Sequence, residues 1–435
     1  MDKIVIDGGV ALEGEVSISG AKNAALPIMA ATLLAPGMHR LHNVPSLADI
    51  RTMKRVLGLM GVTFEEPGAE KGGHTGPPLQ GAPLPDEALA VDTSNLTGWM
   101  APYEVVKTMR AAVLVLGPLL ARARQASVSL PGGCAIGARP INIHLKGLEA
   151  MGVKITLNQG YVEAKARELK GTEIILDFPT VTGTENLLMA ATLAKGTTRI
   201  VNAAQEPEVG DLAQFLVALG AEIEGIGTDV LTIHGVETLV PAPYTVMSDR
   251  IEAGTYLAAA AITKGKVAVT NAPVAHLTAV LEKLHEAGVR CTIAGDCIEV
   301  QPGGGLTGVD AKTLPYPGFP TDMQAQFMAL MSVAKGASVI TETIFEDRFI
   351  HVGELKRLGA DITISGNQAV VRGRRHLSGA PVMATDLRAS ASLIIAGLAA
   401  QGTTEVHRVY HLDRGYAKLV EKLSALGARI KRVPA

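Results

Sequence analysis

Two kinds of hydrophobic segment alternate along the chain. One has an apolar stripe with charges opposite, ends in glycine and continues into alternating residues, as in LEAMGVKI, LVALGAEI and LKRLGADI. The other is Ala-rich and apolar nearly all round, and a turn and a strand-like run follow it, as in AATLAKGTTRIVNA. The first pattern is typical of an amphipathic helix, whereas the second indicates a buried helix followed by a strand.

The two segments recur together six times. The glycines that end the amphipathic stretches are Gly61, Gly152, Gly220, Gly288, Gly359 and Gly427, which gives successive spacings of 91, 68, 68, 71 and 68 residues. Glycine suits the left-handed position that closes a helix. Each unit predicts a helix, a strand, a second helix, a strand and a further strand leading into the next helix. Helical crossovers imply parallel pairing with right-handed connections, and the last two strands can form a hairpin.

Six units in 435 residues predict two α/β domains of three units each, with approximate threefold internal symmetry. We expect the first domain at 22–247 and the second at 1–21 and 248–435. The N-terminal runs IVID and LEGEVSIS resemble the end of a unit, so we expect the first ~20 residues to complete the last unit and bring the chain ends together. Residues 65–91 are rich in Gly and Pro and predict a surface insertion.

Charge and composition narrow the possible partners. The chain has 40 Lys and Arg against 42 Asp and Glu, a formal charge of −2, and only 3% aromatic residues. Neither property favours nucleic-acid binding. The N-terminus lacks a signal-peptide pattern, and the apolar run at 111–121 is shorter than the ~18 residues of a membrane span. We therefore expect a cytoplasmic protein that does not enter a membrane.

Polar and charged residues stand where each Ala-rich helix begins. They are Lys22 and Asn23; Lys107 and Arg110; Thr182, Thr184 and Glu185; Asp249 and Arg250; Thr321 and Asp322; and Asp386 and Arg388. Helix capping alone accounts for Thr182 and Asp249. A cation at a helix start opposes the macrodipole, so Lys22, Arg110 and Arg388 indicate a bound anion. The sequence thus predicts a polyanion pocket in a cleft between the two domains.

Three cysteines are too few for a disulfide framework and form no CxxC zinc pattern. Cys134 lies in the Gly- and Pro-rich segment LPGGCAIGARP (130–140), where the neighbouring Arg139 could lower its pKa and make it an acid, base or nucleophile. A small inert thiol is the equal alternative at this point. Cys291 and Cys297, in VRCTIAGDCIEV, are interpreted as small buried residues of a hairpin.

Metal and nucleotide motifs give no competing prediction. His407 and His411 are four residues apart near Asp413, but the stretch resembles a strand and loop, where this spacing does not bring two side chains to one face. We expect no metal site there. The chain also lacks a G-x-x-x-x-G-K-[ST] loop and a strand-placed G-x-G-x-x-G.

Six segments spread along the chain closely resemble one family. GAKNAALP, SLPGGCAIGARP, FPTDMQAQF, TETIFEDRF, MATDLRAS and HLDRGY are similar to the UDP-N-acetylglucosamine 1-carboxyvinyltransferases, which are enolpyruvyl transferases. The resemblance implies two inverse α/β barrels, each of three βαβαββ units. It also implies transfer of the enolpyruvyl group of phosphoenolpyruvate to the 3′-hydroxyl of UDP-N-acetylglucosamine, by addition and elimination, as the first committed step of peptidoglycan synthesis. Neither a metal nor an organic cofactor is implied.

The resemblance also implies roles for individual residues. Cys134 would donate the proton to the vinyl carbon and be the target of fosfomycin, and Asp322 would be the base for the sugar hydroxyl. Lys22, Arg139 and Arg414 would hold phosphoenolpyruvate, with Asp386 and Arg388 close by. The remaining substrate-binding positions are Asn23, Arg110, Pro140, Ile141, Asn142, Ile143, Thr180, Val181, Thr182, Ile344 and Arg348.

The chain departs from the family pattern in three places. Besides the 65–91 insertion, Asn142 stands where an Asp is frequent and Phe178 where a Lys can approach the nucleotide.

The nearest rival is 5-enolpyruvylshikimate-3-phosphate synthase, which Cys134 disfavours. A second is a non-catalytic UDP-sugar-binding paralogue, which Lys22, Cys134, Asp322 and Arg414 disfavour. Charge and the absence of a nucleotide-transfer histidine motif disfavour an RNA 3′-phosphate cyclase.

Overall fold

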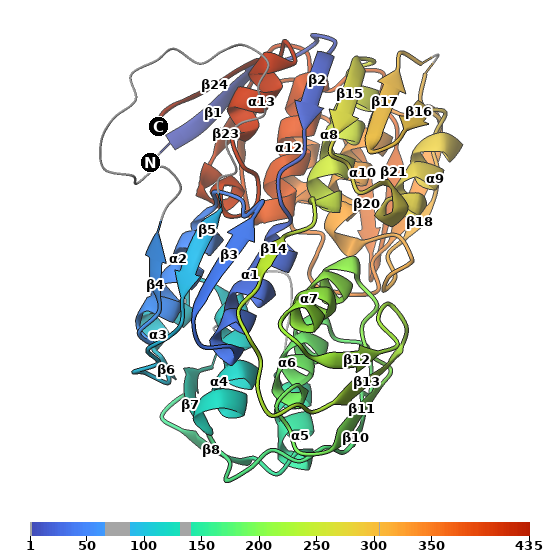
Figure 1. The fold of residues 1–435 in the computed structure, drawn as a ribbon. Coiled ribbons are helices and arrows are strands. Elements are labelled where there is room, and N and C mark those ends of the chain that lie inside the picture. Colours follow the sequence, from blue (N-terminus) through green and yellow to red (C-terminus); the bar gives the residue numbers. More distant parts are fainter. Residues whose placement is uncertain (1, 66–87, 131–140, 304) are drawn as a thin grey trace, which may run out of the picture. The chain divides into compact units, whose positions relative to one another are not determined.

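The computed structural model describes residues 2–65, 88–130, 141–303 and 305–435. The chain forms two compact units. The first unit consists of residues 20–130 and 141–247, and the second consists of residues 2–19 and the described part of 248–435. Each unit contains three four-stranded sheets (Figure 1).

The three sheets of the first unit each gather four short strands, connected through helices. The first sheet has the order β14 (Pro243–Thr245), β3 (Met38–His42), β5 (Leu89–Asp92) and β4 (Thr63–Glu65), with α1 (Lys22–Ala31), the 3₁₀ helix η1 (Thr32–Leu34) and α2 (Ala48–Gly58). The second has β6 (Met100–Ala101), β7 (Gln125–Ser129), β9 (Tyr161–Lys165) and β8 (Lys154–Asn158), with α3 (Tyr103–Val106), η2 (Arg110–Val115), α4 (Leu116–Ala123) and α5 (Asn142–Ala150). The third has β10 (Glu173–Ile175), β11 (Thr197–Val201), β13 (Val230–His234) and β12 (Glu222–Glu224), with α6 (Val181–Ala191) and α7 (Pro207–Ala218).

The second unit repeats this plan. Its first sheet has the order β2 (Glu13–Ser17), β15 (Lys266–Thr270), β17 (Cys297–Gln301) and β16 (Arg290–Ala294), with α8 (Arg250–Ile262), η3 (Val274–His276) and α9 (Thr278–Glu286). The next has β18 (Ala311–Lys312), β19 (Ala337–Thr341), β21 (Gln368–Arg372) and β20 (Asp361–Ser365), with η4 (Thr321–Met323), α10 (Gln324–Met331) and α11 (Val352–Arg357). The last has β22 (Pro381–Met383), β23 (Thr403–His407), β1 (Asp2–Asp7) and β24 (Arg429–Pro434), with α12 (Leu387–Ala399), η5 (Val409–Arg414) and α13 (Leu419–Ala425).

Strand pairing is the same in all six sheets. In each sheet, an edge strand pairs in parallel with the strand that follows an Ala-rich helix, as β10 pairs with β11, where Ile174 lies opposite Ile200. The third and fourth strands form an antiparallel hairpin, and the fourth also pairs with the second. This confirms the repeat predicted from the sequence, with one additional strand before each Ala-rich helix. The unit is therefore βαβαββ, as the family resemblance implies.

The Ala-rich helices form the core of each unit. All thirteen residues of α8 are buried, and this helix packs against α10 and α12, which also pack against each other. The amphipathic helix α9, by contrast, buries only Val280 and Leu284. Small alanine side chains allow the inner helices to approach closely. Each unit therefore has helices inside and sheets with amphipathic helices outside, which confirms the predicted inverse α/β barrel.

The N-terminal residues supply strands to two different sheets. Strand β1 lies between β23 and β24, so that Ile4 pairs with both Val406 and Arg432, and the ends of the chain lie side by side (Figure 1). Strand β2 does not join this last sheet, and the expectation that it would is wrong. It pairs in parallel with β15 instead, because β14, the strand directly before α8, pairs with β3 in the first unit. Without β2, the sheet of β15 would lack its first strand.

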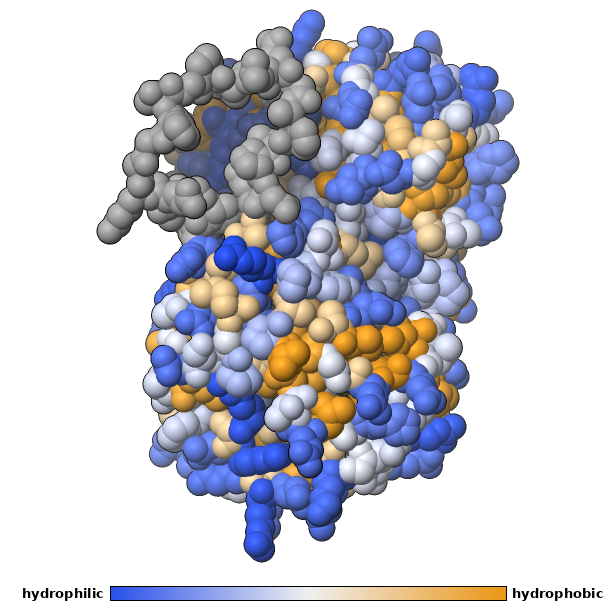
Figure 2. Space-filling view, viewed as in Figure 1, coloured by the Kyte–Doolittle hydropathy of each residue, from blue (hydrophilic) through white to orange (hydrophobic). Residues whose placement is uncertain are grey.

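The exposed surface mixes polar and apolar side chains. Figure 2 shows an apolar area near α7. Val217 of α7 and Val240, in the connection between β13 and β14, are exposed. Exposed apolar side chains are common on folded proteins. In the described parts of the chain, no helix combines the length and the apolar composition needed to cross a membrane.

Candidate functional site

Asp322 is the centre of an ion cluster in the second unit. Its side chain lies in η4, just before α10, and one carboxylate oxygen accepts a hydrogen bond of 2.7 Å from Arg348 Nη2. The other oxygen accepts bonds of 3.0 and 2.9 Å from Nε and Nη2 of Arg388, in the first turn of α12. Arg348 and Arg388 are only 6% and 3% exposed. Two buried guanidinium groups thus share one carboxylate, the geometry that makes such bonds strong.

The charges of this cluster determine its protonation. Burial of the Asp322 carboxyl raises its pKa, but the guanidinium groups of Arg388 and Arg348 outweigh burial and hold the pKa well below the usual range. Burial lowers the pKa of Arg388, whereas the Asp322 charge more than compensates and raises it. At neutral pH, Asp322 and Arg388 are therefore both charged. In this state, Asp322 is a weak base.

A second carboxylate, Glu342, supports the cluster from behind. Arg348 Nη1 donates to the Thr321 hydroxyl over 2.7 Å, and that hydroxyl donates to Glu342 Oε2 over 2.9 Å. Glu342 Oε1 accepts from the backbone N–H of Ile344 at 2.8 Å and is also bonded to Thr313. Glu342 follows β19 directly and is 3% exposed. It lies within TETIFEDRF, so the motif was a signal for a residue that sequence reasoning did not assign.

Polar side chains connect the cluster to all three inner helices. The Tyr416 hydroxyl lies 3.0 Å from Thr255 Oγ1 of α8 and accepts a hydrogen bond of 3.2 Å from Gln326 Nε2 of α10. The Arg388 guanidinium lies over the Tyr416 ring, 5.4 Å from its centroid. Arg388 Nη1 is buried and has no hydrogen-bond partner among the residues that the structure describes. This donor is therefore unsatisfied in the described structure.

Helix capping fixes two more predicted residues of the second unit. Asp386 caps α12, since its Oδ1 accepts from the backbone N–H groups of Arg388 and Ala389 at 2.9 and 3.0 Å. Asp249 caps α8 in the same way, which confirms its predicted structural role. Arg414 is the last residue of η5. The pKa of His411 is lowered by burial first, then by the charge of Arg408 and then by that of Arg414. Asp386 acts on the same histidine in the opposite direction.

In the first unit, Lys22 begins α1 without a side-chain cap. Its ammonium group lies 3.2 Å from Asp49 Oδ2, and the two residues are 8% and 3% exposed. Because a lysine at a helix start opposes the macrodipole, the buried Asp49 carboxylate offsets an unfavourable placement. The adjacent Asn23 is exposed.

One predicted nucleotide-binding residue of the first unit, Thr182, contacts a buried histidine. Thr182 Oγ1 lies 3.4 Å from Nε2 of His144, and Asn186 Nδ2 donates to His144 Nδ1 over 3.0 Å. Burial and the charge of Arg110 lower the pKa of His144 to about 4, so the ring is neutral at pH 7. Since Nδ1 accepts from an amide, the proton is assigned to Nε2, which donates to Thr182. The predicted cap was wrong by two residues: Thr180, not Thr182, caps α6.

His144 and Asn186 are functional candidates that sequence reasoning missed. His144 directly follows the predicted run at 139–143, and this adjacency was the available signal. Asn142, Ile143 and His144 all lie in the first turn of α5, with Ile141 at its N-cap position, and Val181 begins α6. Phe178 is 54% exposed, two residues before Thr180.

Some predicted site residues lie outside the described ranges, and two cysteines are less buried than predicted. Cys134, Arg139 and Pro140 lie outside the described residues, as does nearly all of the 65–91 insertion. Cys291 and Cys297 do lie in a hairpin, but both are half-buried rather than buried, because the hairpin forms the outer part of its sheet. Burial raises the pKa of the Cys291 thiol to about 11. Within the described ranges, no group of three or more His, Cys, Asp or Glu side chains is arranged to hold a metal ion.

Comparisons with known proteins agree on one family. The model of EPSP synthase (3-phosphoshikimate 1-carboxyvinyltransferase) matches residues 6–423. The UDP-N-acetylglucosamine 1-carboxyvinyltransferases of Desulfatibacillum aliphaticivorans and Desulfosudis oleivorans are 57% and 58% identical to the chain over 433 residues, covering 100% of each sequence.

Solved structures give the same picture of the fold. The enolpyruvyl transferase NikO from Streptomyces tendae matches with a TM-score of 0.87 and 27% identity, covering 100% of this chain and 99% of NikO. The EPSP synthase from Acinetobacter baumannii matches with a TM-score of 0.73 and 20% identity, covering 100% of both chains. The latter likeness concerns the fold alone.

Proposed function

The chain belongs to the family of the EPSP synthases and UDP-N-acetylglucosamine 1-carboxyvinyltransferases, and we propose that it transfers the enolpyruvyl group of phosphoenolpyruvate to the 3′-hydroxyl of UDP-N-acetylglucosamine with release of phosphate. Full-length relatives that share more than half of its residues carry this activity in their names. The substrates are metabolites of the cytoplasm, where we infer that the reaction starts peptidoglycan synthesis and so serves cell-wall growth and division.

The observation that carries the proposal is the Asp322 cluster. Phosphoenolpyruvate has a phosphate and a carboxylate, and such anions are best held by guanidinium groups and lysines. The unpartnered Nη1 of the buried Arg388 is a donor for one of them. We assign Lys22, Arg139 and Arg414 to the same substrate, with Asp386 keeping Arg388 at the start of α12.

The proposed chemistry needs one base and one acid. Asp322 accepts the proton of the sugar hydroxyl while the oxygen of that hydroxyl bonds to C2 of phosphoenolpyruvate. The Cys134 thiol donates a proton to C3. The product is a tetrahedral ketal that still carries the phosphate. The C2–O bond to phosphate then breaks, the Cys134 thiolate takes a proton back from C3, and Asp322 returns its proton to the departing phosphate. The same thiol is the proposed site of alkylation by fosfomycin.

The low pKa of Asp322 gives this scheme a sequence of events. With both guanidinium groups on its oxygens, the carboxylate is a weak base. A substrate anion that recruits Arg388 or Arg348 shares their charge and weakens their hold, so the pKa of Asp322 rises. Asp322 therefore becomes an effective base only once an anionic substrate is bound.

UDP-N-acetylglucosamine brings two more phosphates and a uracil ring. We assign Arg110 to the phosphates, and Asn23, Pro140 to Ile143, Thr180, Val181, Thr182, Ile344 and Arg348 to the remainder of the molecule. The neutral His144 fixes the Thr182 hydroxyl from behind, so that its oxygen keeps one orientation. Glu342 does the same for the backbone of Ile344.

The decisive experiment measures phosphate release from phosphoenolpyruvate with either UDP-N-acetylglucosamine or shikimate 3-phosphate as acceptor. We expect release only with UDP-N-acetylglucosamine. Release only with shikimate 3-phosphate would move the chain to the EPSP synthases. If neither acceptor gives phosphate while UDP-N-acetylglucosamine binds in calorimetry, the chain is a non-catalytic UDP-sugar-binding protein.

A further inference from the structure

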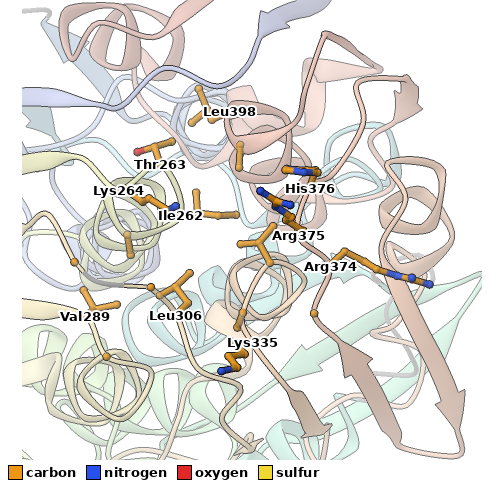
Figure 3. A pocket seen from close by; sticks show the side chains of 18 of the residues that line it. Ile262, Thr263, Lys264, Val289, Leu306, Lys335, Arg374, Arg375, His376 and Leu398 are labelled. Atoms are coloured by element: carbon orange, nitrogen blue, oxygen red, sulfur yellow. The ribbon is translucent and has the colours of Figure 1, made fainter.

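The second unit contains a cavity of about 660 Å³ (Figure 3). The cavity lies at one end of the inner helices, and Asp322 lies at the other end. Its walls come from the C-terminal ends of α8 and α12 and from the residues that follow α10. Asp322 and Arg388, by contrast, lie at the N-terminal ends of α10 and α12. Since α12 has thirteen residues, the two ends are roughly 20 Å apart. The cavity is therefore distinct from the candidate catalytic cluster.

Positive charge dominates this cavity. Its lining includes Lys264, Lys335, Arg374, Arg375 and His376, and the lining residues that the structure describes include no Asp or Glu. Arg374 is paired with Asp361 at 2.9 Å and extends away from the other labelled side chains (Figure 3). Lys264, Lys335 and Arg375 are exposed to solvent, and none of them forms an ion pair with a residue that the structure describes. Water and salt screen their mutual repulsion, and an anion that enters the cavity is attracted by all of them.

Helix capping explains only part of this arrangement. Lys264 and Lys335 follow the ends of α8 and α10, where a cation is favourable for the macrodipole. Arg375 and His376 have no such reason, because they belong to the connection that follows strand β21. The corresponding connection of the preceding repeat, QPGGGLTG at 301–308, has no charged residue. The repeat itself therefore does not require charges at this place.

We propose that this cavity binds a small organic phosphate. Lys264 and Arg375 would hold its phosphate group, and Lys335, at another side of the cavity (Figure 3), would add to the positive charge that attracts a dianion. Ile262, Leu306 and other apolar residues line the remaining wall, and they suit an apolar or ring-shaped body. A volume of about 660 Å³ lies in the range of small-molecule sites. Figure 3 shows Arg375 and His376 side by side, with Lys264 extending toward them.

Equilibrium dialysis with 1-naphthyl phosphate tests the site by counting bound molecules per chain at saturation. The triple variant Lys264→Ala/Lys335→Ala/Arg375→Ala removes the three cations. The matched variant Lys312→Ala/Arg429→Ala/Lys431→Ala removes three exposed cations of the same unit that do not line the cavity. We expect the first variant to bind about one molecule fewer than the wild type and the second to equal the wild type. Counting separates the cavity from any phosphate bound near Asp322.

The proposal would be overturned by an equal count in the cavity variant and the wild type, or by an equal reduction in both variants. Binding of the uncharged 1-naphthol with the same count would also overturn it, because the cavity would then select only the ring. The cavity residues are remote from Asp322, so thermal unfolding and phosphate release are expected to stay at wild-type levels. If the triple variant does not fold, Arg375→Gln, a single exposed change, serves instead.

Discussion

At the scale of single residues, the chemistry depends on the oxygen atoms of Asp322. In Asp322→Asn, the amide can still contact one guanidinium group but cannot accept a proton from the sugar hydroxyl. We expect turnover to fall by about 10² to 10⁴-fold, while UDP-N-acetylglucosamine still binds. Phosphate release and calorimetry measure the two quantities separately. A wild-type rate would remove Asp322 from the mechanism.

Glu342 provides a test of positioning at the same scale. Its Oε2 accepts the Thr321 hydroxyl that holds Arg348, and in Glu342→Gln an amide nitrogen must replace one of the accepting oxygens. A hydrogen bond to a charged group contributes about 1.5–3 kcal/mol, so kcat should fall by about tenfold or more. Asp347→Asn, an exposed change in the same motif, is the control. Equal kinetics in the two variants would contradict the role of Glu342.

The buried imidazole of His144 predicts a pH dependence of stability. Its pKa is lowered to about 4 in the folded chain, against about 6.5 when unfolded, so the unfolded chain binds the extra proton between these values. The contribution of neutral His144, about 3 kcal/mol, is complete above pH 6.5 and is lost as the pH falls toward 4. Thermal unfolding of His144→Gln should vary less with pH in this window. Lys146→Gln, on the same helix, should retain the wild-type slope.

At the scale of elements, the sequence pattern predicted the helix ends and the burial of the Ala-rich helices, because both depend on neighbouring residues. Glycines such as Gly152 and Gly220 end their helices in the left-handed conformation, and the Ala-rich helices are buried as their composition indicated. The partner of β2 could not be predicted, because β15 is about 250 residues away and the pairing depends on β14 joining the other unit. The prediction that Thr182 caps α6 failed for a similar reason, since the Thr182 hydroxyl is bound to His144 through a tertiary contact.

The strand β1 allows a paired measurement at this scale. Ile6 is fully buried, whereas its neighbour Val5 points to the other face of the sheet and is half-buried. Ile6→Ala should lower the free energy of unfolding by about 2–4 kcal/mol, because a buried side chain leaves a cavity. Val5→Ala should cost clearly less. Urea unfolding compares them, and equal losses would mean that β1 does not contribute a core face.

For the whole molecule, the repeat was readable from the sequence but the complete site was not. Six glycines at regular spacing predicted the six repeats, although one strand of each βαβαββ unit followed only from the family resemblance, and the cations at helix starts included Arg388, which binds Asp322. Glu342 and His144 escaped because neither stands at the start of an Ala-rich helix, and only tertiary folding brings them to Thr321 and Thr182. Carboxylates and imidazoles behind a site have no local pattern of their own.

The cyclic order of the repeats predicts tolerance to circular permutation. Asp2 pairs with Pro434 in the last sheet, so a short linker of about 2–5 residues can join the two ends as a hairpin. New ends within 66–87 leave β4 and β5 paired with each other and β5 paired with β3. We expect this permutant to unfold within a few degrees of the wild type and to retain its phosphate release.

A second permutant provides the contrast. New ends between Ala259 and Ala260 would cut α8 where all of its residues are buried, and would expose backbone groups inside the core. We expect this protein not to fold, as measured by circular dichroism and thermal unfolding. If it folded as well as the first permutant, the inner helix would not be the structural centre of its unit. If the first permutant failed, the pairing of β1 with β24 would not be what closes the last sheet.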